Sequence, residues 1–217
     1  MTLQAYQLAC SRGERALFAD LHFELAAGQA MRVAGANGRG KTSLLRMLCG
    51  LSYPAAGEVR WHGRDIRAMR EQFGSQLTYL GHANGVKDDL LAWENVVVAA
   101  RLAGHPVDRD AACDALERLG LGEAAELPTR VLSQGQRKRV ALARLRPGAG
   151  APLWILDEPF AALDQRAVRD LCDTFDAHLA AGGMLVYTTH QEVVLRAERL
   201  LLLDLDREAG HARELPC

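Results

Sequence analysis

The sequence predicts an α/β fold with a mainly parallel core sheet, an antiparallel β flank and an inserted helical subdomain. Short apolar runs alternate with helical patterns, as in parallel sheets covered by helices. The runs at 153–156 and 184–187 are apolar throughout, which is typical of central strands buried on both faces. The first runs follow one another without a helix between them, and about residues 84–130 are mostly helical in pattern.

The length of 217 residues suits one domain, residues 1–217, with the helical subdomain inserted at about 84–130. We expect strands at Leu3–Leu8, Leu21–Leu25, Ala30–Ala34, Glu58–Trp61, Leu77–Leu80, Leu153–Leu156, Met184–Tyr187 and Leu200–Leu203. We expect helices at about residues 41–49, 90–103, 109–119, 136–145, 165–180 and 191–198. The polar tail after Asp204 is expected to be loosely held.

The composition narrows the class of protein. The net charge is −1, from 26 basic and 27 acidic residues, so a nucleic-acid partner, which would need a basic excess, is not expected. No apolar run reaches the roughly 18 residues needed to cross a bilayer, and the first residues do not form a signal peptide. Five cysteines without a metal-binding spacing indicate free thiols in a reducing compartment. We therefore expect a cytoplasmic chain with no direct membrane insertion.

Residues 35–42, GANGRGKT, match the phosphate-loop pattern G-x-x-x-x-G-K-[ST] between a strand and a helix. Its glycines let backbone N–H groups turn inward around phosphate oxygens, and the helix N-terminus adds positive charge. Lys41 supplies charge for the β- and γ-phosphates, and the hydroxyl of Thr42 can bind Mg²⁺. The candidate nucleotide-binding residues here are Gly35, Ala36, Asn37, Gly38, Arg39, Gly40, Lys41, Thr42 and Ser43.

Residues 152–159, PLWILDEP, place Asp157 and Glu158 at the end of a buried strand. Two carboxylates are costly there unless a cation or hydrogen bonds hold them, and a magnesium nucleotide meets that need. Asp157 is therefore the candidate Mg²⁺ ligand, directly or through a water. If the extended strand continues, Glu158 faces the other way and can act as general base on an attacking water, a role worth about 10²–10⁴ in rate.

Residues 132–140, LSQGQRKRV, combine a helix cap with a basic run. Ser133 can cap a helix that starts near Gly135, where free N–H groups make an anion site. The basic residues 137–139 crowd the positive end of that helix, which the helix dipole disfavours. Two explanations stay open, a nearby anion that relieves the charge or a solvated basic face.

These segments together resemble the nucleotide-binding domain of ABC transporters, a family of P-loop NTPases. GANGRGKTS resembles the Walker A loop, LSQGQ the signature, and LWILDEP the Walker B strand with its catalytic glutamate. AALD at 161–164 resembles the D-loop, and TTH at 188–190 resembles the switch-histidine segment. The motifs stand in order over nearly the whole chain, so the resemblance implies an ABC ATPase fold that uses ATP and Mg²⁺.

The resemblance also implies a second copy of the chain in a head-to-tail dimer. Each ATP would lie between the Lys41 loop of one copy and the signature of the other. His190 would contact the γ-phosphate. Gln134 replaces a usual glycine, which puts the fit of the signature to the phosphate in question. The implied signature residues are Ser133, Gln134, Gly135 and Gln136.

Two further positions depart from the family pattern. Arg12 stands where an adenine-stacking tyrosine is common, and its planar guanidinium could stack on adenine or face solvent. His82 falls at or beside the position of a glutamine that reaches Mg²⁺ or the attacking water. His82 is therefore a candidate sensor of nucleotide at the hinge between subdomains; the alternative is that it only satisfies a loop hydrogen bond.

The segments YLGHANGVKDDLLAWEN, GEVRWHG and GGMLVYTTHQ resemble the ATP-binding subunits of bacterial haem exporters used in cytochrome c maturation. This resemblance implies a separate integral membrane permease subunit as partner and a peripheral position on the cytoplasmic face of the inner membrane. It implies that ATP hydrolysis drives haem export or release of a haem-loaded periplasmic chaperone. The alternatives are the ATPase subunit of another small ABC exporter and a soluble ABC-type factor acting on nucleic acid or ribosomes.

Overall fold

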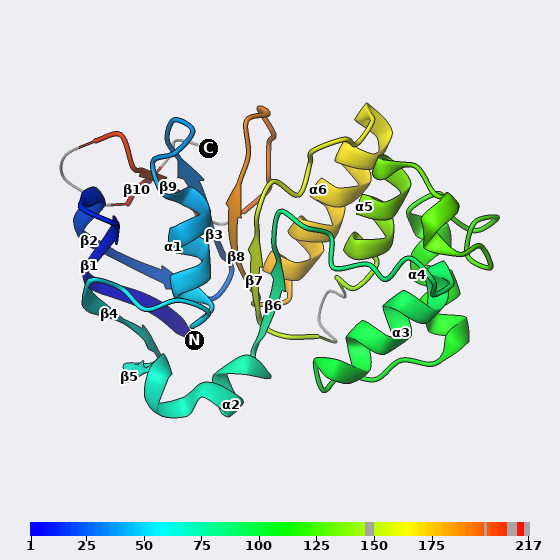
Figure 1. The fold of residues 1–217 in the computed structure, drawn as a ribbon, viewed down its shortest axis with the longest axis horizontal. Coiled ribbons are helices and arrows are strands. Elements are labelled where there is room, and N and C mark those ends of the chain that lie inside the picture. The colour runs from blue at the N-terminus through cyan, green and yellow to red at the C-terminus, as the bar shows by residue number, and fades with distance from the viewer. Residues whose placement is uncertain (146–149, 198, 208–211, 215–217) are drawn as a thin grey trace.

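The computed structural model describes residues 1–145, 150–197, 199–207 and 212–214, and in that part of the chain two sheets form the core (Figure 1). The antiparallel sheet has the order β2-β1-β4-β5, with β1 (Thr2–Arg12), β2 (Arg15–Ala26), β4 (Ala56–Trp61) and β5 (Arg64–Asp65). The second sheet has the order β10-β9-β3-β8-β7-β6 and is parallel except for β10. Its strands are β3 (Gln29–Ala34), β6 (Leu77–Leu80), β7 (Leu153–Leu156), β8 (Met184–Thr188), β9 (Arg199–Asp204) and β10 (Arg213–Glu214).

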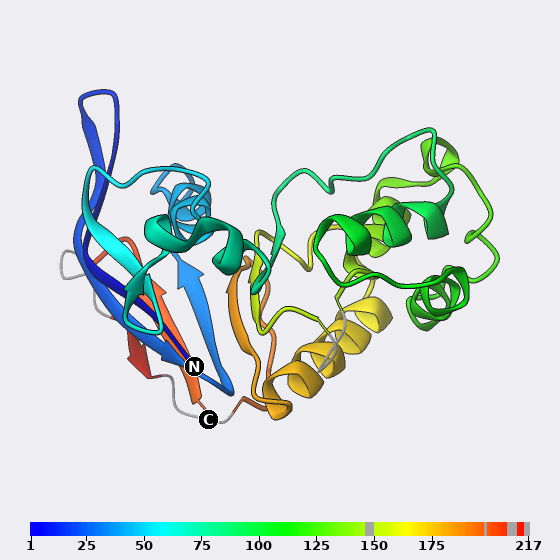
Figure 2. The same cartoon turned by 90° about the horizontal axis from the view of Figure 1, so that it is seen from below.

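The helices lie between and beside these sheets. They are α1 (Lys41–Leu48), α2 (Arg70–Gly74), α3 (Ala92–Leu102), α4 (Arg109–Arg118), α5 (Gln134–Leu142) and α6 (Gln165–Ala180), with short 3₁₀ turns η1 (Ile66–Met69) and η2 (Thr129–Val131). Figure 1 shows α1 between the two sheets and α3 to α6 on the other side of the parallel sheet. The β1–β2 hairpin projects from the body in Figure 2.

The parallel sheet is buried on both faces, as the apolar runs predicted. In β7, Leu153 and Ile155 pack with α1 and the antiparallel sheet, whereas Trp154 and Leu156 pack with α6. Such double burial explains why this strand is apolar at every position. The alternation of two cores also fixes the register, because a slip by one residue would exchange the two faces.

All of the expected strands are present, but the helix expected at 191–198 is wrong. Residues 191–197 form no helix, and residue 198 lies outside the described residues. Side-chain oxygens take the backbone donors there: Gln191 N–H donates to Thr189 Oγ1 over 3.0 Å, and Arg196 N–H donates to Asp176 Oδ1 over 2.7 Å. These local acceptors compete with helical carbonyls and favour the irregular segment.

The tail is held more firmly than its polarity predicted. β10 pairs with β9, with Arg213 opposite Leu202, and Leu205 is buried. Backbone pairing and one apolar anchor therefore overturn the expectation of a loosely held tail for these residues. The rest of the tail, residues 208–211 and 215–217, lies outside the described residues.

The helices α3, α4 and α5 share a hydrophobic cluster of their own. It includes Val96 of α3, Leu116 of α4 and Val140 of α5. The cluster thus reaches past residue 130 into α5, although the insertion boundary at about 84–130 stays a prediction. Within the described residues, no helix combines the length and the apolar character that a membrane span requires.

A buried histidine ties α6 to the parallel sheet. The ring of His178 stacks on Trp154 at 3.7 Å between centroids, and its Nε2 donates to Met184 O over 3.2 Å. A Cβ on Gly183 would lie 2.3 Å from that ring, so the sequence needs glycine there. Burial lowers the pKa of His178 from 6.5 to about 4, so the folded protein holds this ring neutral.

We expect His178→Phe to flatten the acid side of the stability curve. Below pH 6.5 the unfolded chain gains a proton at this position, whereas the folded chain resists protonation until about pH 4. Stability from the neutral ring is therefore complete above that range and is lost as pH falls, by up to about 3 kcal/mol. Denaturant titrations of both proteins between these pH values measure how the free energy of unfolding changes with pH. A packing loss that is the same at every pH does not change this slope. Equal slopes would contradict the prediction.

Candidate functional site

The phosphate loop leaves β3 and enters α1 through backbone turns that favour glycine. Gly35, Gly38 and Gly40 have φ values of 142°, 81° and 99°. Gly40 is the residue before α1, and no side chain of the described residues caps this helix. The first N–H groups of α1 therefore remain for an anion, at the positive end of the helix dipole. A Cβ at Gly40 would lie 3.2 Å from side-chain atoms of Leu17 and Phe18, so the space there is tight for a larger residue.

Lys41 folds over this loop. Its Nζ donates to Gly35 O over 2.6 Å and to Ala36 O over 3.4 Å. The ammonium is thus placed on the same loop whose N–H groups would surround phosphate oxygens. This arrangement suits the binding of a polyphosphate.

Asp157 joins the acidic pair to the phosphate-loop helix. It follows β7, and its side chain belongs to a residue only 3% exposed. Oδ2 accepts a hydrogen bond from Thr42 Oγ1 over 2.7 Å, and Oδ1 accepts one from Thr188 Oγ1 over 2.8 Å. These bonds offset the cost of burying the carboxylate. The structure therefore brings Thr42 and Asp157 together, as expected of a shared site.

Glu158 does not continue the extended strand. The direction of its side chain was predicted from a continued strand, and that assumption is wrong. Its φ of 50° lies in the left-handed region, which non-glycine residues rarely adopt. Its Oε1 is buried and receives no hydrogen bond from the described residues, although His190 Nε2 lies 3.4 Å away. Glu158 and His190 therefore form an ion pair through Oε1, at a separation too long to be counted as a clear hydrogen bond.

The signature lies at the start of α5. Ser133 caps the helix: its Oγ accepts from Gln136 N–H over 3.2 Å, and its own N–H donates to Gln136 Oε1 over 2.9 Å. Gln134 is exposed, and a Cβ at Gly135 would lie 2.8 Å from Ala162 O. Within the described residues, no hydrogen bond or ion pair joins this segment to the phosphate loop. The structure does not bring the two motifs together in one copy.

The basic run beside the signature is neutralised by the protein itself. Arg137 pairs with Asp88 at 3.0 Å, and Arg139 pairs with Asp164. Lys138 is 6% exposed; burial lowers its pKa, and the charges of Asp157 and Glu158 oppose that shift. The interpretation as a solvated basic face is therefore wrong. The anions that relieve the charge are carboxylates of this chain.

Arg12 and His82 lie away from the phosphate loop's own contacts. Arg12 ends β1, opposite Arg15 in the projecting hairpin, and it is exposed (Figure 2). His82 is exposed just after β6 and makes no hydrogen bond to the described residues. The alternative in which His82 only satisfies a loop hydrogen bond therefore has no support. Adenine stacking by Arg12 and sensing by His82 stay predictions.

The comparisons with known proteins agree with this geometry. The family model described as ABC transporter matches residues 18–161. The chain belongs to the ABC transporter family.

Two curated relatives in this ABC family cover most of the chain. The chain is 55% identical to the cytochrome c biogenesis ATP-binding export protein CcmA of Aromatoleum aromaticum, over 88% of this chain and 89% of the relative. It is 50% identical to the protein of the same name from Nitrosospira multiformis, over 94% of this chain and 98% of the relative. The resemblance to ABC ATPases that the motifs predicted is confirmed.

Solved ABC structures confirm the fold class. A putative ABC transporter ATP-binding protein from Pyrococcus furiosus has a TM-score of 0.80 at 21% identity, covering 95% of this chain and 98% of that chain. The ATP-binding cassette MJ0796, in a dimeric post-hydrolysis state with ADP and Pi, has a TM-score of 0.80 at 21% identity and covers 99% of both chains. The predicted P-loop α/β architecture is therefore the ABC ATPase fold.

The oxygen atoms of Thr42 and Asp157 beside the phosphate loop fit a magnesium ion. The Thr42 hydroxyl and the Asp157 carboxylate meet at 2.7 Å, and Mg²⁺ prefers oxygen ligands. Among the described residues, no group of three or more His, Cys, Asp or Glu side chains could hold a metal. Mg²⁺ commonly takes one or two protein ligands and completes its shell with phosphate oxygens and water. Thr42 and Asp157 are therefore the residues that would hold it.

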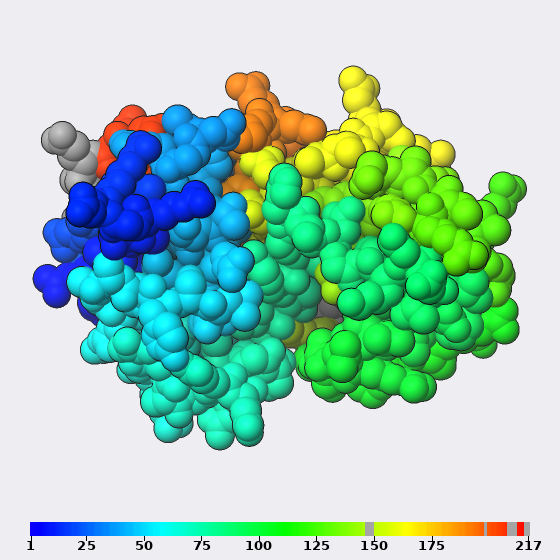
Figure 3. All heavy atoms as spheres, in the orientation of Figure 1, coloured from blue at the N-terminus to red at the C-terminus, as the bar shows by residue number. Residues whose placement is uncertain are grey.

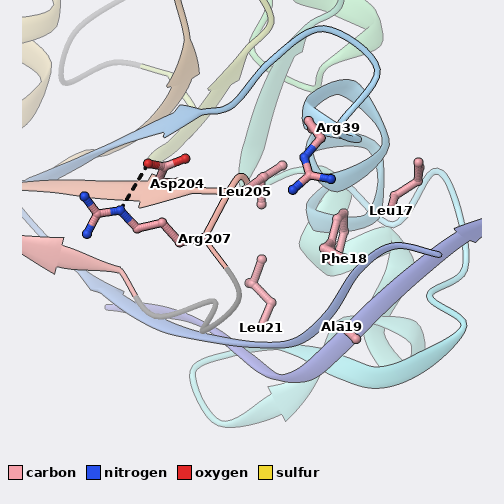
Figure 4. A pocket seen from close by; sticks show the side chains of 8 residues that line it. All are labelled: Leu17, Phe18, Ala19, Leu21, Arg39, Asp204, Leu205 and Arg207. Atoms are coloured by element: carbon pink, nitrogen blue, oxygen red, sulfur yellow. Dashed lines mark ion pairs between the residues drawn. The ribbon is translucent and has the colours of Figure 1, made fainter.

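The sequence did not predict a role for Asp206, which follows β9 and forms hydrogen bonds with the phosphate loop. Its Oδ2 accepts from Ala36 N–H over 2.8 Å and its Oδ1 accepts from Arg39 Nε over 2.6 Å. Figure 4 shows Arg39 pointing toward Leu205 and Phe18 at a cavity of about 180 Å³. The hydrogen bond between Ala36 and Asp206 joins residues 170 positions apart in sequence, so no local motif could have predicted it.

Proposed function

We propose that this chain is the ATP-hydrolysing subunit of an export complex for cytochrome c biogenesis. The relatives named CcmA carry this proposal, because they share about half of their residues with it over most of both chains. The geometry supports ATP hydrolysis independently, since a phosphate loop, the acidic pair after β7 and a histidine lie together at the carboxyl ends of the parallel strands.

In the proposed reaction, the N–H groups of the loop and the Lys41 ammonium bind the β- and γ-phosphates of ATP. Mg²⁺, when bound, neutralises charge that develops on the phosphates. Glu158 accepts a proton from the attacking water through Oε1, which receives no hydrogen bond from the described residues. His190, 3.4 Å from that oxygen, stands beside the same space and would contact the γ-phosphate.

The active form that we propose contains two copies of the chain. Among the described residues, no hydrogen bond or ion pair joins the Ser133 segment to the phosphate loop of the same copy, so the segment would face the nucleotide of the other copy. The capping box uses the N–H groups of Ser133 and Gln136, so those of Gln134 and Gly135 would supply donors for that role. Each of the two sites would then need both copies, with Ser133, Gln134, Gly135 and Gln136 contributed by the second.

The proposed partner is a separate integral membrane permease, with the chain peripheral on the cytoplasmic face of the bacterial inner membrane. The helix α3 offers an apolar face, because Val98 and Leu102 are 41% and 85% exposed one helical turn apart. Residues of β6 and α3 line a cavity of about 110 Å³, and Figure 3 shows a hollow between the α2 region and α3. His82 lies on the chain that joins β6 to α3, which suits the proposed sensor at the hinge.

Two other apolar residues near the start of α3, Leu90 and Trp93, are less suitable for docking. Leu90 is half-buried, and Trp93 packs against the helical cluster with its Nε1 donating to Glu126 Oε2 over 3.3 Å. Arg109 lies over the Trp93 ring at 5.3 Å. Trp93 therefore serves the packing of the helical region, and the exposed part of α3 is the sharper docking candidate.

The function is tested by purifying a tagged chain from membranes, identifying its partner and recording haem absorbance. A matching deletion strain is assayed for c-type cytochromes. We expect an integral membrane partner and loss of c-type cytochromes that the wild-type gene restores. A membrane partner with normal cytochrome yield would indicate another exporter. A chain found with ribosomes or nucleic acid would overturn the proposal.

We expect Leu102→Asp to weaken permease docking at least about tenfold, because burying a leucine contributes about 1.5–3 kcal/mol. Basal ATP hydrolysis should be unchanged, since Leu102 is 85% exposed on α3 and supports no core. The matched control is Val194→Asp, at a residue 88% exposed after β8. Membrane co-purification and ATPase rate are measured for both variants. Equal loss of co-purification in both would show that α3 is not the docking face.

A further inference from the structure

The hydroxyl of Thr188 connects both members of the acidic pair. Thr188 ends β8 and is fully buried, with 0% exposure. Its Oγ1 donates to Asp157 Oδ1 over 2.8 Å and accepts from Glu158 N–H over 2.8 Å. A single buried oxygen thus binds the side chain of one carboxylate residue and the backbone of the next.

The parallel pairing of β7 and β8 places this hydroxyl. Leu156 lies opposite Tyr187, so the next residues, Asp157 just after β7 and Thr188 at the end of β8, lie side by side. The Thr188 hydroxyl donates its hydrogen bond to Asp157 Oδ1. A lone pair of Oγ1 is therefore turned toward the Glu158 N–H. The direction of the second bond therefore depends on the first.

Glu158 needs such support because its backbone is in an unfavourable region. Its φ of 50° persists only where neighbouring groups hold it. This turn directs the carboxylate to the side where His190 Nε2 lies 3.4 Å from Oε1. An extended residue at this position would point its side chain elsewhere.

We infer that Thr188 is a positioning residue for Glu158, holding the left-handed turn that aims the carboxylate at the attacking water. The inference rests on the proposed ATP hydrolysis. Thr188 itself touches no reacting atom. Its second bond, to Asp157, also links this turn to Thr42 of the phosphate-loop helix, since both hydroxyls donate to the same carboxylate.

A merely structural threonine predicts a different outcome from a positioning one. Valine has the same shape as threonine and fills the same buried volume but lacks the hydroxyl. If Thr188 only packs, Thr188→Val should leave kinetics unchanged. If Thr188 positions Glu158, the substitution should lower kcat and spare ATP binding, because the phosphate loop keeps its own contacts.

The test compares wild type, Thr188→Val and Thr188→Ser as full chains, with ATP affinity and kcat measured separately. We expect Thr188→Val to lose about 10- to 100-fold in kcat with ATP affinity within about threefold, because the Glu158 N–H and Asp157 Oδ1 both lose their hydrogen bond to the hydroxyl. Thr188→Ser keeps the hydroxyl and should recover most of kcat. Thr188→Ala is a second variant that removes the hydroxyl without placing a methyl beside Asp157, and the same loss of kcat is expected for it.

A double variant separates positioning from general damage. In a Glu158→Gln background, Thr188→Val should lower kcat little further, because the group it positions is already disabled. Additive losses, or wild-type kcat in Thr188→Val, would overturn the inference alone. A wild-type chain without ATPase activity would instead overturn the proposed function.

Discussion

The Glu158→Gln variant is expected to bind ATP with nearly wild-type affinity and to hydrolyse it at least about 100-fold more slowly. Glutamine keeps the shape and the backbone bond from Glu158 N–H to Thr188 Oγ1. It removes the negative oxygen that would take the proton of the attacking water. The loss should therefore fall on kcat, whereas the loop contacts that bind phosphate remain.

Single-turnover and steady-state assays, together with nucleotide titration, measure this result. The matched control is Glu192→Gln, an exposed glutamate in the segment after β8, which should behave as wild type. Near-wild-type turnover in Glu158→Gln would remove this residue from the mechanism. Loss of ATP affinity equal to the loss of turnover would indicate that Glu158 supports binding rather than chemistry.

The parts of the fold that could be predicted from sequence are those specified by local pattern. The apolar run 153–156 required burial on both faces, and the structure divides it between two cores. The phosphate loop was recognisable because its glycines and Lys41 lie within eight residues whose turn and helix are local. Ser133 likewise predicted the start of α5, where it forms a capping box with Gln136.

The parts that could not be predicted depend on contacts between distant residues or on one backbone angle. Asp206 meets Ala36 only because β9 and β3 end side by side. Glu158 turns at a φ of 50°, which an alternating pattern cannot encode. The segment 191–197 has apolar residues at helical spacing, yet Asp176 of α6 takes one of its N–H groups. Tertiary hydrogen bonds overrode local preference in each case.

The basic run after the signature shows the same limit in charge. From sequence, its positive side chains crowd a helix N-terminus, and either a nearby anion or a solvated face could explain them. In the structure Asp88 and Asp164, from two different segments, supply the counter-charges. Of the three basic residues, Lys138 is the most buried, and burial lowers its pKa. Pairing partners from distant segments decide which charges are free to meet a ligand.

Lys41→Ala is expected to weaken ATP binding by at least about 10- to 100-fold, because a charge-assisted contact contributes about 1.5–3 kcal/mol. A methyl group cannot replace the ammonium, which lies over the loop within 2.6 Å of Gly35 O. Hydrolysis should be lost with binding. Nucleotide titration of dilute, purified chain and an ATPase assay measure the two effects separately.

The second half of this experiment asks whether the signature serves another copy. Ser133→Ala would also remove the cap of α5, a loss of about 1 kcal/mol, so Ser133→Asp is the better variant. Aspartate retains an acceptor for Gln136 N–H and places negative charge where the second copy's phosphate would lie. Monomer ATP binding should then stay at the wild-type level while hydrolysis falls. If Ser133→Asp lost monomer binding as fully as Lys41→Ala, the two motifs would share one nucleotide in one chain, and the head-to-tail site would be wrong.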